Sequence, residues 1–219
     1  MTRAVAEIRP YQPQDRSTLR QICCDTADAG QPVERFFPDR EVIADLLTNY
    51  YTQYEPEFAY VAENNGGVVG YLTGCLDTRR FKRAMAWQIV PAVFGKALFR
   101  GVLWHPQAVR FVRANLGIWL KGEFRNAEIL REYPAHLHVN IREGFRDQRL
   151  GERLVEAFCN HARRAGAPGI HAGVSAENTR AGHFFEELGF AEVHREPRCR
   201  SQDGTGRVLY TIIYGKKCH

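Results

Sequence analysis

The sequence predicts a mixed α/β protein whose sheet-forming parts are separated by a helical insertion. Strand-like and helix-like segments alternate towards both ends of the chain, Asn65-Gly66 joins two β-rich runs, and a basic, helix-patterned stretch occupies about 79–130. Such alternation gives a sheet with helices packed on its faces, and Asn-Gly between β-rich runs is a strong hairpin signal. At 219 residues, 1–219 suits a single domain that carries this insertion.

The N-terminal part, up to residue 78, is expected to contain three strands and two helices. The expected elements are a strand at 6–11, helices at 15–27 and 39–54, and strands at 58–63 and 68–76. Apolar residues recur at helical spacing in both helices. Asp15 stands at the start of the first helix, where an acidic residue is common.

The C-terminal part, from residue 131, returns to the same alternation. The expected elements are a strand at 135–141, a helix at 146–166, a strand at 169–175, a helix at 177–190, and strands at 191–195 and 207–215 around the turn at 203–206. Gly166 and Gly189 are the predicted helix stops, because glycine adopts the left-handed conformation that often ends a helix. The predicted buried face of the 146–166 helix comprises Leu150, Leu154, Ala157, Phe158 and His161.

The six cysteines show no CxxC pairing, and the N-terminus carries no apolar stretch behind a basic start. We therefore expect reduced thiols in a cytoplasmic protein without a signal peptide. A zinc site built from His194, Cys199, Cys218 and His219 would match no known ligand spacing, so no metal is expected.

The insertion holds most of the net charge. Between Arg79 and Arg125 there are ten basic residues and one acid, Glu123, which suggests an acidic partner for this segment. Aromatic residues are interleaved with the charges, and we interpret them as the core stripe of two or three amphipathic helices packed on the body. Base stacking on a nucleic acid and interfacial contact with a membrane are the less favoured alternatives. Lys96 and Arg100 make the apolar run too polar to span a bilayer.

The strand–loop–helix at 136–165 is the predicted functional unit. Free N–H groups at a helix N-terminus bind phosphate, helped by the helix dipole. The loop from Arg146 to Gly151 has a single glycine, while Arg146 and Arg149 bring positive charge to the turn. The alternative is a helix that is simply well capped, by Asp147.

Two longer motifs decide between these alternatives. "HLHVNIREGFRDQRLGERLVEAF" and "GVSAENTRAGHFFEELGF" follow each other in the order and spacing of the GNAT family of acetyl-CoA-dependent N-acetyltransferases, which the chain resembles. Arg149 departs from the family pattern, because it replaces the first glycine of the loop motif. The "AHLHVN" sequence and the insertion resemble, more weakly, the acetyltransferase-like domain of O-GlcNAcases.

The resemblance implies a GNAT-like, mostly antiparallel sheet with a splayed strand pair, flanking helices, and acetyl-CoA as the acetyl donor. It implies that the pantetheine arm pairs with Ile141–Glu143 and that the pyrophosphate lies on the backbone of 146–152. It also implies cofactor contacts from Asn178 and Phe185. The implied cofactor-binding residues are Ile141, Arg142, Glu143, Arg146, Asp147, Gln148, Arg149, Leu150, Gly151, Glu152, Asn178 and Phe185.

Acetyl transfer by direct attack needs a neutral amine, and therefore a base or a water relay. His138 is the favoured base over His136, and Glu143 is the other candidate. The family often has a proton-donating tyrosine where this chain has Phe185, so Tyr214 is considered as a substitute donor.

The acceptor is expected to be an amine, with an acidic group matched to the basic insertion, and a homodimer is compatible with the sequence. Two alternatives remain: a pseudo-enzyme that binds acetyl-CoA without turnover, and a binder of polyanions or membrane surfaces that uses the insertion.

Overall fold

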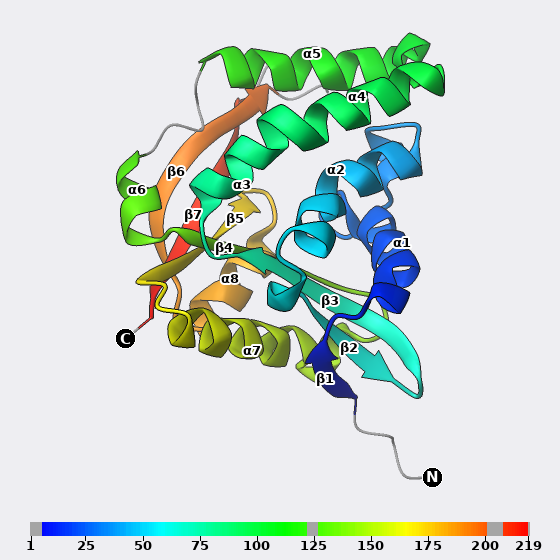
Figure 1. The fold of residues 1–219 in the computed structure, drawn as a ribbon. Coiled ribbons are helices and arrows are strands. Elements are labelled where there is room, and N and C mark those ends of the chain that lie inside the picture. The colour runs from blue at the N-terminus through cyan, green and yellow to red at the C-terminus, as the bar shows by residue number, and fades with distance from the viewer. Residues whose placement is uncertain (1–5, 122–126, 201–207, 219) are drawn as a thin grey trace.

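A seven-stranded sheet runs through the molecule in the order β1-β2-β3-β4-β5-β7-β6 (Figure 1). The structure is a computed structural model that describes residues 6–121, 127–200 and 208–218, so the predicted turn at 203–206 lies outside it. The strands are β1 (Glu7–Pro10), β2 (Tyr60–Asn64), β3 (Gly67–Cys75), β4 (Ala135–Ile141), β5 (Gly169–Ser175), β6 (Ala191–Arg200) and β7 (Val208–Lys217). Neighbouring strands are antiparallel except β4 and β5, which confirms the mixed, mostly antiparallel sheet.

The parallel pair at the centre of the sheet separates soon after it begins. β4 and β5 are in register only at Ala135↔Ile170 and His136↔His171. β5 then continues along β7 as far as Ser175, and β4 continues along β3 as far as Ile141. The sheet is therefore split between β4 and β5, as the predicted splayed pair requires.

Helices cover both faces of the sheet (Figure 1). On one face lie α1 (Arg16–Thr26) and α2 (Arg40–Gln53). On the other lie α7 (Leu150–Arg164) and α8 (Thr179–Glu187), which bury the main hydrophobic core against the strands. Of the predicted α7 face, Leu150, Leu154 and Phe158 are fully buried, while Ala157 and His161 are partly buried.

Local chemistry explains where several elements begin and turn. The Asp39 carboxylate accepts from the Val42 N–H at 3.0 Å and so caps α2. Asp15 makes no such cap, because its carboxylate instead bonds Arg9 at 2.7 Å. In the β2–β3 hairpin, Asn65 and Gly66 have φ of 50° and 76°, as a tight hairpin turn needs.

The insertion contains more helices than the two or three expected. Its described part holds α3 (Thr78–Ala84), a π-helical turn (Met85–Ile89), α4 (Val90–Phe99), a 3₁₀ turn (Val102–Trp104), α5 (Pro106–Lys121) and α6 (Ala127–Glu132). Gly101, at φ 70°, follows α4, and Pro106 begins α5. Within the described ranges, no helix combines the length and the apolar character that crossing a membrane would demand.

The expected aromatic core stripe of the insertion is only partly present. Phe81 and Phe111 pack inward, against Tyr50 and Phe37 among others. The remaining aromatics whose side chains are described, Trp87, Phe94, Phe99 and Trp104, are exposed; the Trp119 side chain lies outside the described set. The reason is that α4 is apolar on two faces, and α2 covers only the one with Ile89, Val93 and Ala97.

The predicted helix at 146–166 is divided at its start. Arg146–Gln148 form a 3₁₀ turn, Arg149 is left-handed at φ 55°, and α7 begins at Leu150. Gly166 and Gly189, with φ of 82° and 80°, follow α7 and α8 as predicted. The cysteines at 23, 24, 75, 159 and 218 are free thiols.

Candidate active site

The two faces of β4 differ in chemistry. Successive side chains of a strand point to opposite faces of the sheet. Leu137, Val139 and Ile141 belong to the core shared with α7. His136 and Asn140 point the other way, since the Tyr51 hydroxyl bonds His136 Nε2 at 2.7 Å and the Asn140 amide donates to the Tyr71 hydroxyl at 2.8 Å. His138 is also on this polar face, beside the Tyr51 ring.

The backbone of β4 leaves polar groups along the split in the sheet. The Arg142 N–H donates to the Val69 carbonyl of β3 at 2.9 Å. Because paired and unpaired residues alternate in an antiparallel ladder, the amides and carbonyls of Val139 and Ile141 face away from β3, towards β5. The register with β5 ends at His136. The edge of β4 at Val139 and Ile141 therefore borders the gap, whereas the Arg142 amide does not.

The N-terminus of α7 lies directly after this edge. Its N-cap residue, Arg149, makes no side-chain capping bond. The Arg153 N–H donates to the Arg149 carbonyl at 3.2 Å and so begins the regular helical ladder. The first N–H groups of α7 have no helical carbonyl one turn earlier, and the helix dipole is positive at this end. This geometry suits an anion such as a phosphate.

Both charged side chains of the loop have partners inside the chain. The Arg149 guanidinium bonds both carboxylate oxygens of Glu152, at 2.6 and 2.7 Å. Arg146 Nε donates to the Ile141 carbonyl at 3.3 Å, and its guanidinium lies against Gly30, where a Cβ would come within 2.7 Å. The contact of either arginine with a cofactor phosphate stays a prediction.

Gly151 has a packing role in the structure. A Cβ placed there would lie 3.2 Å from Cζ of Phe184 on α8. The missing side chain therefore lets α7 approach α8. A side chain at 151 would point at the Phe184 ring, and the contact of the Gly151 backbone with a phosphate stays a prediction. Gln148 is exposed at the same turn; the Asp147 side chain lies outside the described set.

The other residues expected to touch the cofactor lie on α8. Asn178 Oδ1 accepts from the Ala181 N–H at 3.2 Å, which makes it the N-cap of the helix. Phe185 is buried between Phe190 and Tyr214, with ring centroids at 5.2 and 6.2 Å. The Tyr214 hydroxyl lies close against Gly182 of α8.

His136 is held in a buried hydrogen-bond chain. The Thr78 hydroxyl donates to the Pro134 carbonyl at 2.7 Å, so it can only accept from His136 Nδ1, also at 2.7 Å. His136 Nε2 then accepts from the Tyr51 hydroxyl. Burial lowers the pKa of His136 well below its ordinary value. It is therefore a neutral structural histidine that ties β4 to α2 and α3.

His138 is accessible to solvent, in contrast to His136. Dense surrounding protein nevertheless lowers the pKa of His138 to about 4, and His171 adds to the shift. The His138 side chain is therefore both exposed to solvent and closely flanked by protein, on the polar face of β4. Glu143 is exposed in the turn after β4.

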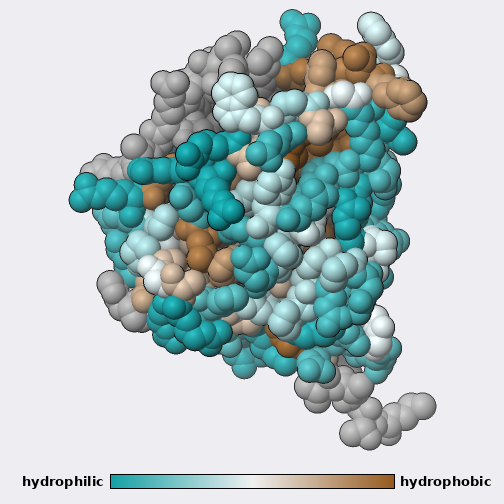
Figure 2. All heavy atoms as spheres, viewed as in Figure 1, coloured by the Kyte–Doolittle hydropathy of each residue, from teal (hydrophilic) through white to brown (hydrophobic). Residues whose placement is uncertain are grey.

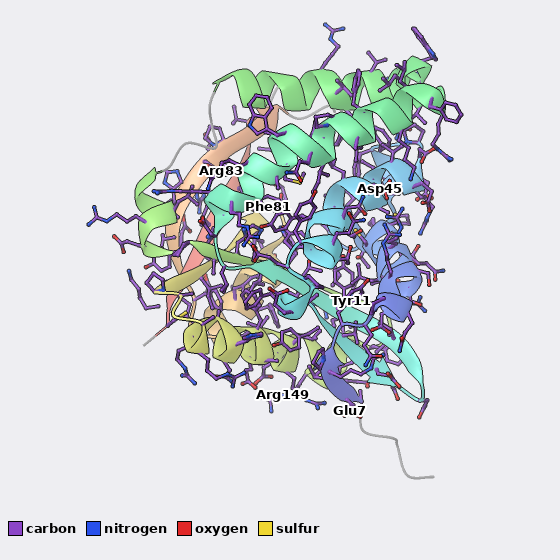
Figure 3. The ribbon with its side chains drawn as sticks, viewed as in Figure 1. Glu7, Tyr11, Asp45, Phe81, Arg83 and Arg149 are labelled. Atoms are coloured by element: carbon purple, nitrogen blue, oxygen red, sulfur yellow. The ribbon has the colours of Figure 1, made fainter. Side chains whose placement is uncertain are left out.

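The insertion packs against this polar face of β4. Phe81 of α3 lies 4.7 Å from the His136 ring and faces α2 (Figure 3). Lys82, the next residue, lowers the pKa of both His136 and His171 through its charge. The polar face of β4 therefore looks onto cationic and imidazole groups.

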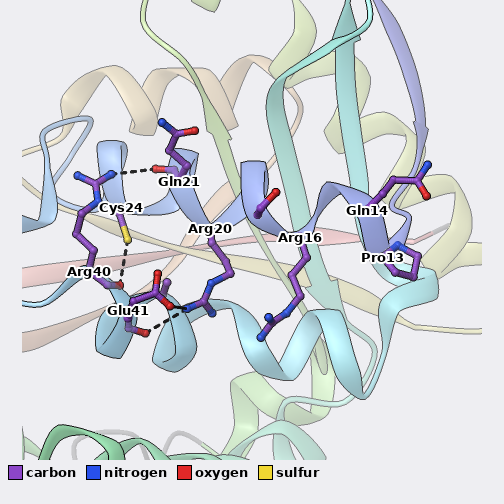
Figure 4. Close-up of a pocket in the computed structure, with 10 residues that line it drawn as sticks. Pro13, Gln14, Arg16, Arg20, Gln21, Cys24, Arg40 and Glu41 are labelled. Atoms are coloured by element: carbon purple, nitrogen blue, oxygen red, sulfur yellow. Dashed lines mark hydrogen bonds and ion pairs between the residues drawn. The ribbon is translucent and has the colours of Figure 1, made fainter. Parts of the chain in front are cut away.

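A groove of about 500 Å³ lies between α1 and α2 (Figure 4). Arg20 and Arg40 line it, but both are already paired, Arg20 with Glu41 at 2.6 Å and Arg40 with Glu34 at 2.9 Å. Among the described residues, no group of three or more His, Cys, Asp or Glu side chains is placed to hold a metal. Cys199 and His219, of the zinc set considered above, fall outside the described side chains.

Solved structures with the same fold define the class of protein. The crystal structure of SsHAT superimposes with a TM-score of 0.75 and 26% identity over 98% of both chains. The structure of yncA from Salmonella typhimurium, solved with its cofactor acetyl-CoA, gives a TM-score of 0.57 at 15% identity, over 98% of this chain and 94% of that one. The split sheet is therefore that of the acetyltransferase fold.

The family model described as "Acetyltransferase (GNAT) family" matches residues 28–190. The chain belongs to the GNAT family of acetyltransferases, and acyl transfer is the chemistry of that family. Protein O-GlcNAcase of Rattus norvegicus is 21% identical over 192 residues, which is 88% of this chain and 21% of that protein. The same enzyme of Mus musculus matches equally. The chain thus spans about a fifth of the length of these relatives.

Proposed function

We propose that this chain transfers an acetyl group from acetyl-CoA to an amine acceptor by direct attack in a ternary complex. The observation that carries the proposal is the open edge of β4, at Val139 and Ile141, leading directly to the uncapped N-terminus of α7. An extended amide-containing arm can pair with such an edge, while its diphosphate rests on the helix end.

The cofactor-binding set is refined by this geometry. Val139 joins Ile141 as a backbone partner for the pantetheine arm, and the Arg142 amide leaves the set because β3 already bonds it. The pyrophosphate would rest on backbone N–H groups within Arg146–Glu152. Asn178 and Phe185 would flank the cofactor from α8.

His138 is the proposed base, with Glu143 as the alternative. Its lowered pKa keeps the ring neutral near pH 7 and free to accept a proton or a hydrogen bond from water. The same shift makes it a weak base, since general bases work best with a pKa near the operating pH. Acetyl transfer should therefore be real but slow.

The acceptor is proposed to be an amine that carries a negative group. Lys82, on the insertion, lies within electrostatic reach of His136 and His171. Lys82→Gln should raise the acceptor KM with little change in kcat. Arg79→Gln, three residues earlier on the exposed side of α3, is the matched control. Equal KM values for both variants would contradict this role.

Cofactor binding is tested by placing a negative charge at the α7 N-terminus. Gln148→Glu should weaken acetyl-CoA binding about tenfold by repelling phosphate, while the helix dipole keeps the fold at least as stable. Gln14→Glu makes the same change near the start of α1 and should leave binding unchanged. Calorimetric titration of both variants decides, and equal affinities would refute the phosphate site.

Turnover is tested by release of free thiol from acetyl-CoA over a library of amines. A specific observation keeps the binding-only alternative in view: Phe185 has no proton for the departing thiolate. Acetyl-CoA binding without thiol release, for any amine, would favour the pseudo-enzyme.

A further inference from the structure

Large apolar side chains are exposed together on the outer side of the insertion. They form what we call the α4 face, defined by Trp87, Val90, Phe94, Leu98, Phe99 and Trp104. Trp87, Phe99 and Trp104 are 81%, 93% and 80% exposed. Figure 2 shows hydrophobic atoms gathered at the upper edge of the molecule, over α4 and α5. Contiguous apolar surface of this kind marks an interaction site.

The packing of α4 explains why this face is not part of the core. Ile89, Val93 and Ala97 recur every four residues and are buried against α2. Val90, Phe94 and Leu98 recur at the same spacing one position later, on the solvent side. A helix that is apolar on two faces normally has two partners. The described part of the chain supplies only one.

The charges that the insertion itself brings to the α4 face are all of one sign. From Arg79 to Lys121 the sequence holds nine Lys and Arg residues and no Asp or Glu. Lys96 and Arg100 bond Asp45 and Asp39 of the body, at 2.6 and 2.8 Å. Four arginines, Arg79, Arg83, Arg110 and Arg113, are exposed, and none has a carboxylate partner among the described residues. The occupant of this face should therefore be anionic.

We propose that the α4 face docks the protein on an anionic lipid membrane. The aromatic tips protrude, which suits a fluid interface, whereas anchors in protein interfaces fill preformed pockets. Val90 and Leu98 add aliphatic surface that has no use in stacking nucleic-acid bases. A second copy is disfavoured, because a two-fold interface would place the cationic insertion of one copy against that of the other. Arginines beside interfacial tryptophans match anionic headgroups.

The test is vesicle flotation of the full chain. The protein should float with vesicles containing phosphatidylserine, remain unbound with phosphatidylcholine alone, and detach as salt rises. Emission from its tryptophans should shift to shorter wavelength on the anionic vesicles. No flotation on anionic vesicles at low salt would overturn the proposal.

Matched variants identify the surface. Trp87→Ser/Phe99→Ser/Trp104→Ser should lose flotation while keeping the melting temperature, because these side chains are mostly exposed. Arg110→Gln/Arg113→Gln should weaken binding on the order of tenfold. Arg163→Gln/Arg164→Gln removes the same charge from α7, on the opposite side of the molecule (Figure 1), and should bind like the wild type.

Three outcomes would contradict lipid binding by the α4 face, and two of them would assign it to another occupant. Flotation of the aromatic variant equal to that of the wild type would show that this face does not bind lipid. Concentration-dependent dimers in sedimentation velocity, lost in the aromatic variant and unaccompanied by flotation, would assign the face to a second copy. Retention of a single-stranded oligonucleotide without flotation would assign it to nucleic acid.

Discussion

The two faces of β4 reach their structures by different routes. On the α7 side, Leu137, Val139 and Ile141 pack against a helix that follows a few residues later in the sequence. On the other side, His136 is fixed by Tyr51, which lies 85 residues away, and by Thr78, 58 residues away. One half of the proposed site is thus local in sequence, and the other is assembled from distant segments.

This difference has a consequence for function. The proposed cofactor half would use backbone groups, so many side chains would be compatible with it, including Arg149 in place of a glycine. The proposed acceptor half would use side chains, whose ionisation depends on burial. The difference between the two faces of β4 predicts two kinds of effect. Variants of α8 and of the loop before α7 should change the rate of acetyl transfer or the loop geometry, whereas variants around His136 should change the stability of the fold.

The largest effect is expected from Phe185→Tyr. If the hydroxyl reaches the departing thiolate it should raise kcat, since a positioned acid is typically worth about 10²–10⁴-fold. The affinity for acetyl-CoA should not change. Phe184→Tyr, which adds the same hydroxyl one residue earlier, should not raise kcat. Steady-state kinetics on an identified acceptor would settle the matter. An unchanged kcat beside brisk wild-type turnover would mean that no acid is missing.

Tyr51→Phe should mainly reduce stability. The change leaves the buried His136 Nε2 without its donor, which costs about 1–3 kcal/mol of unfolding free energy. Tyr54→Phe, on the same helix but at an exposed hydroxyl that bonds Gln88, should cost less than about 0.5 kcal/mol. Urea denaturation of both variants makes the comparison. Equal losses would show that the His136 chain is energetically unimportant.

A pH-dependent stability loss should follow from the depressed pKa values of three histidines. His136, His138 and His171 all titrate below the ordinary value of 6.5 in the folded state, so on acidification the unfolded state takes up protons first. Stability is then full above pH 6.5 and falls as the pH drops towards 4. The melting temperature should decrease between pH 7 and pH 5, before most carboxylates titrate, and less so in His138→Gln. A flat profile over that window would contradict the assignment.

The smallest effect concerns the left-handed backbone at Arg149. Arg149→Gly and Arg149→Ala both remove the exposed pair with Glu152, so their difference isolates the conformation at φ 55°. The glycine variant should be more stable than the alanine variant by about 1 kcal/mol. Thermal denaturation of the pair measures this difference. An alanine variant as stable as the glycine variant would indicate that the loop relaxes.

The sequence by itself determined the elements whose signals are local. Period-two and helical patterns of apolar residues place the strands and helices. The turns and helix ends follow from Asn65-Gly66, Gly166 and Gly189. Each of these signals depends on the conformation of a few neighbouring residues. The two motifs around 136–190 also indicated the family and, with it, the split between β4 and β5.

Only the tertiary structure decided the rest, since these features depend on distant partners. The Arg142 amide points to β3, and the Val139 backbone borders the gap. The hydrogen bond from Arg142 to Val69 decides this, because it sets which residues of β4 face β3. The tertiary structure distinguished buried His136 from accessible His138, two residues apart on one strand, through packing by α2 and α3. It also left one of the two apolar faces of α4 in solvent, since helical periodicity shows that a face is apolar but not whether another element covers it.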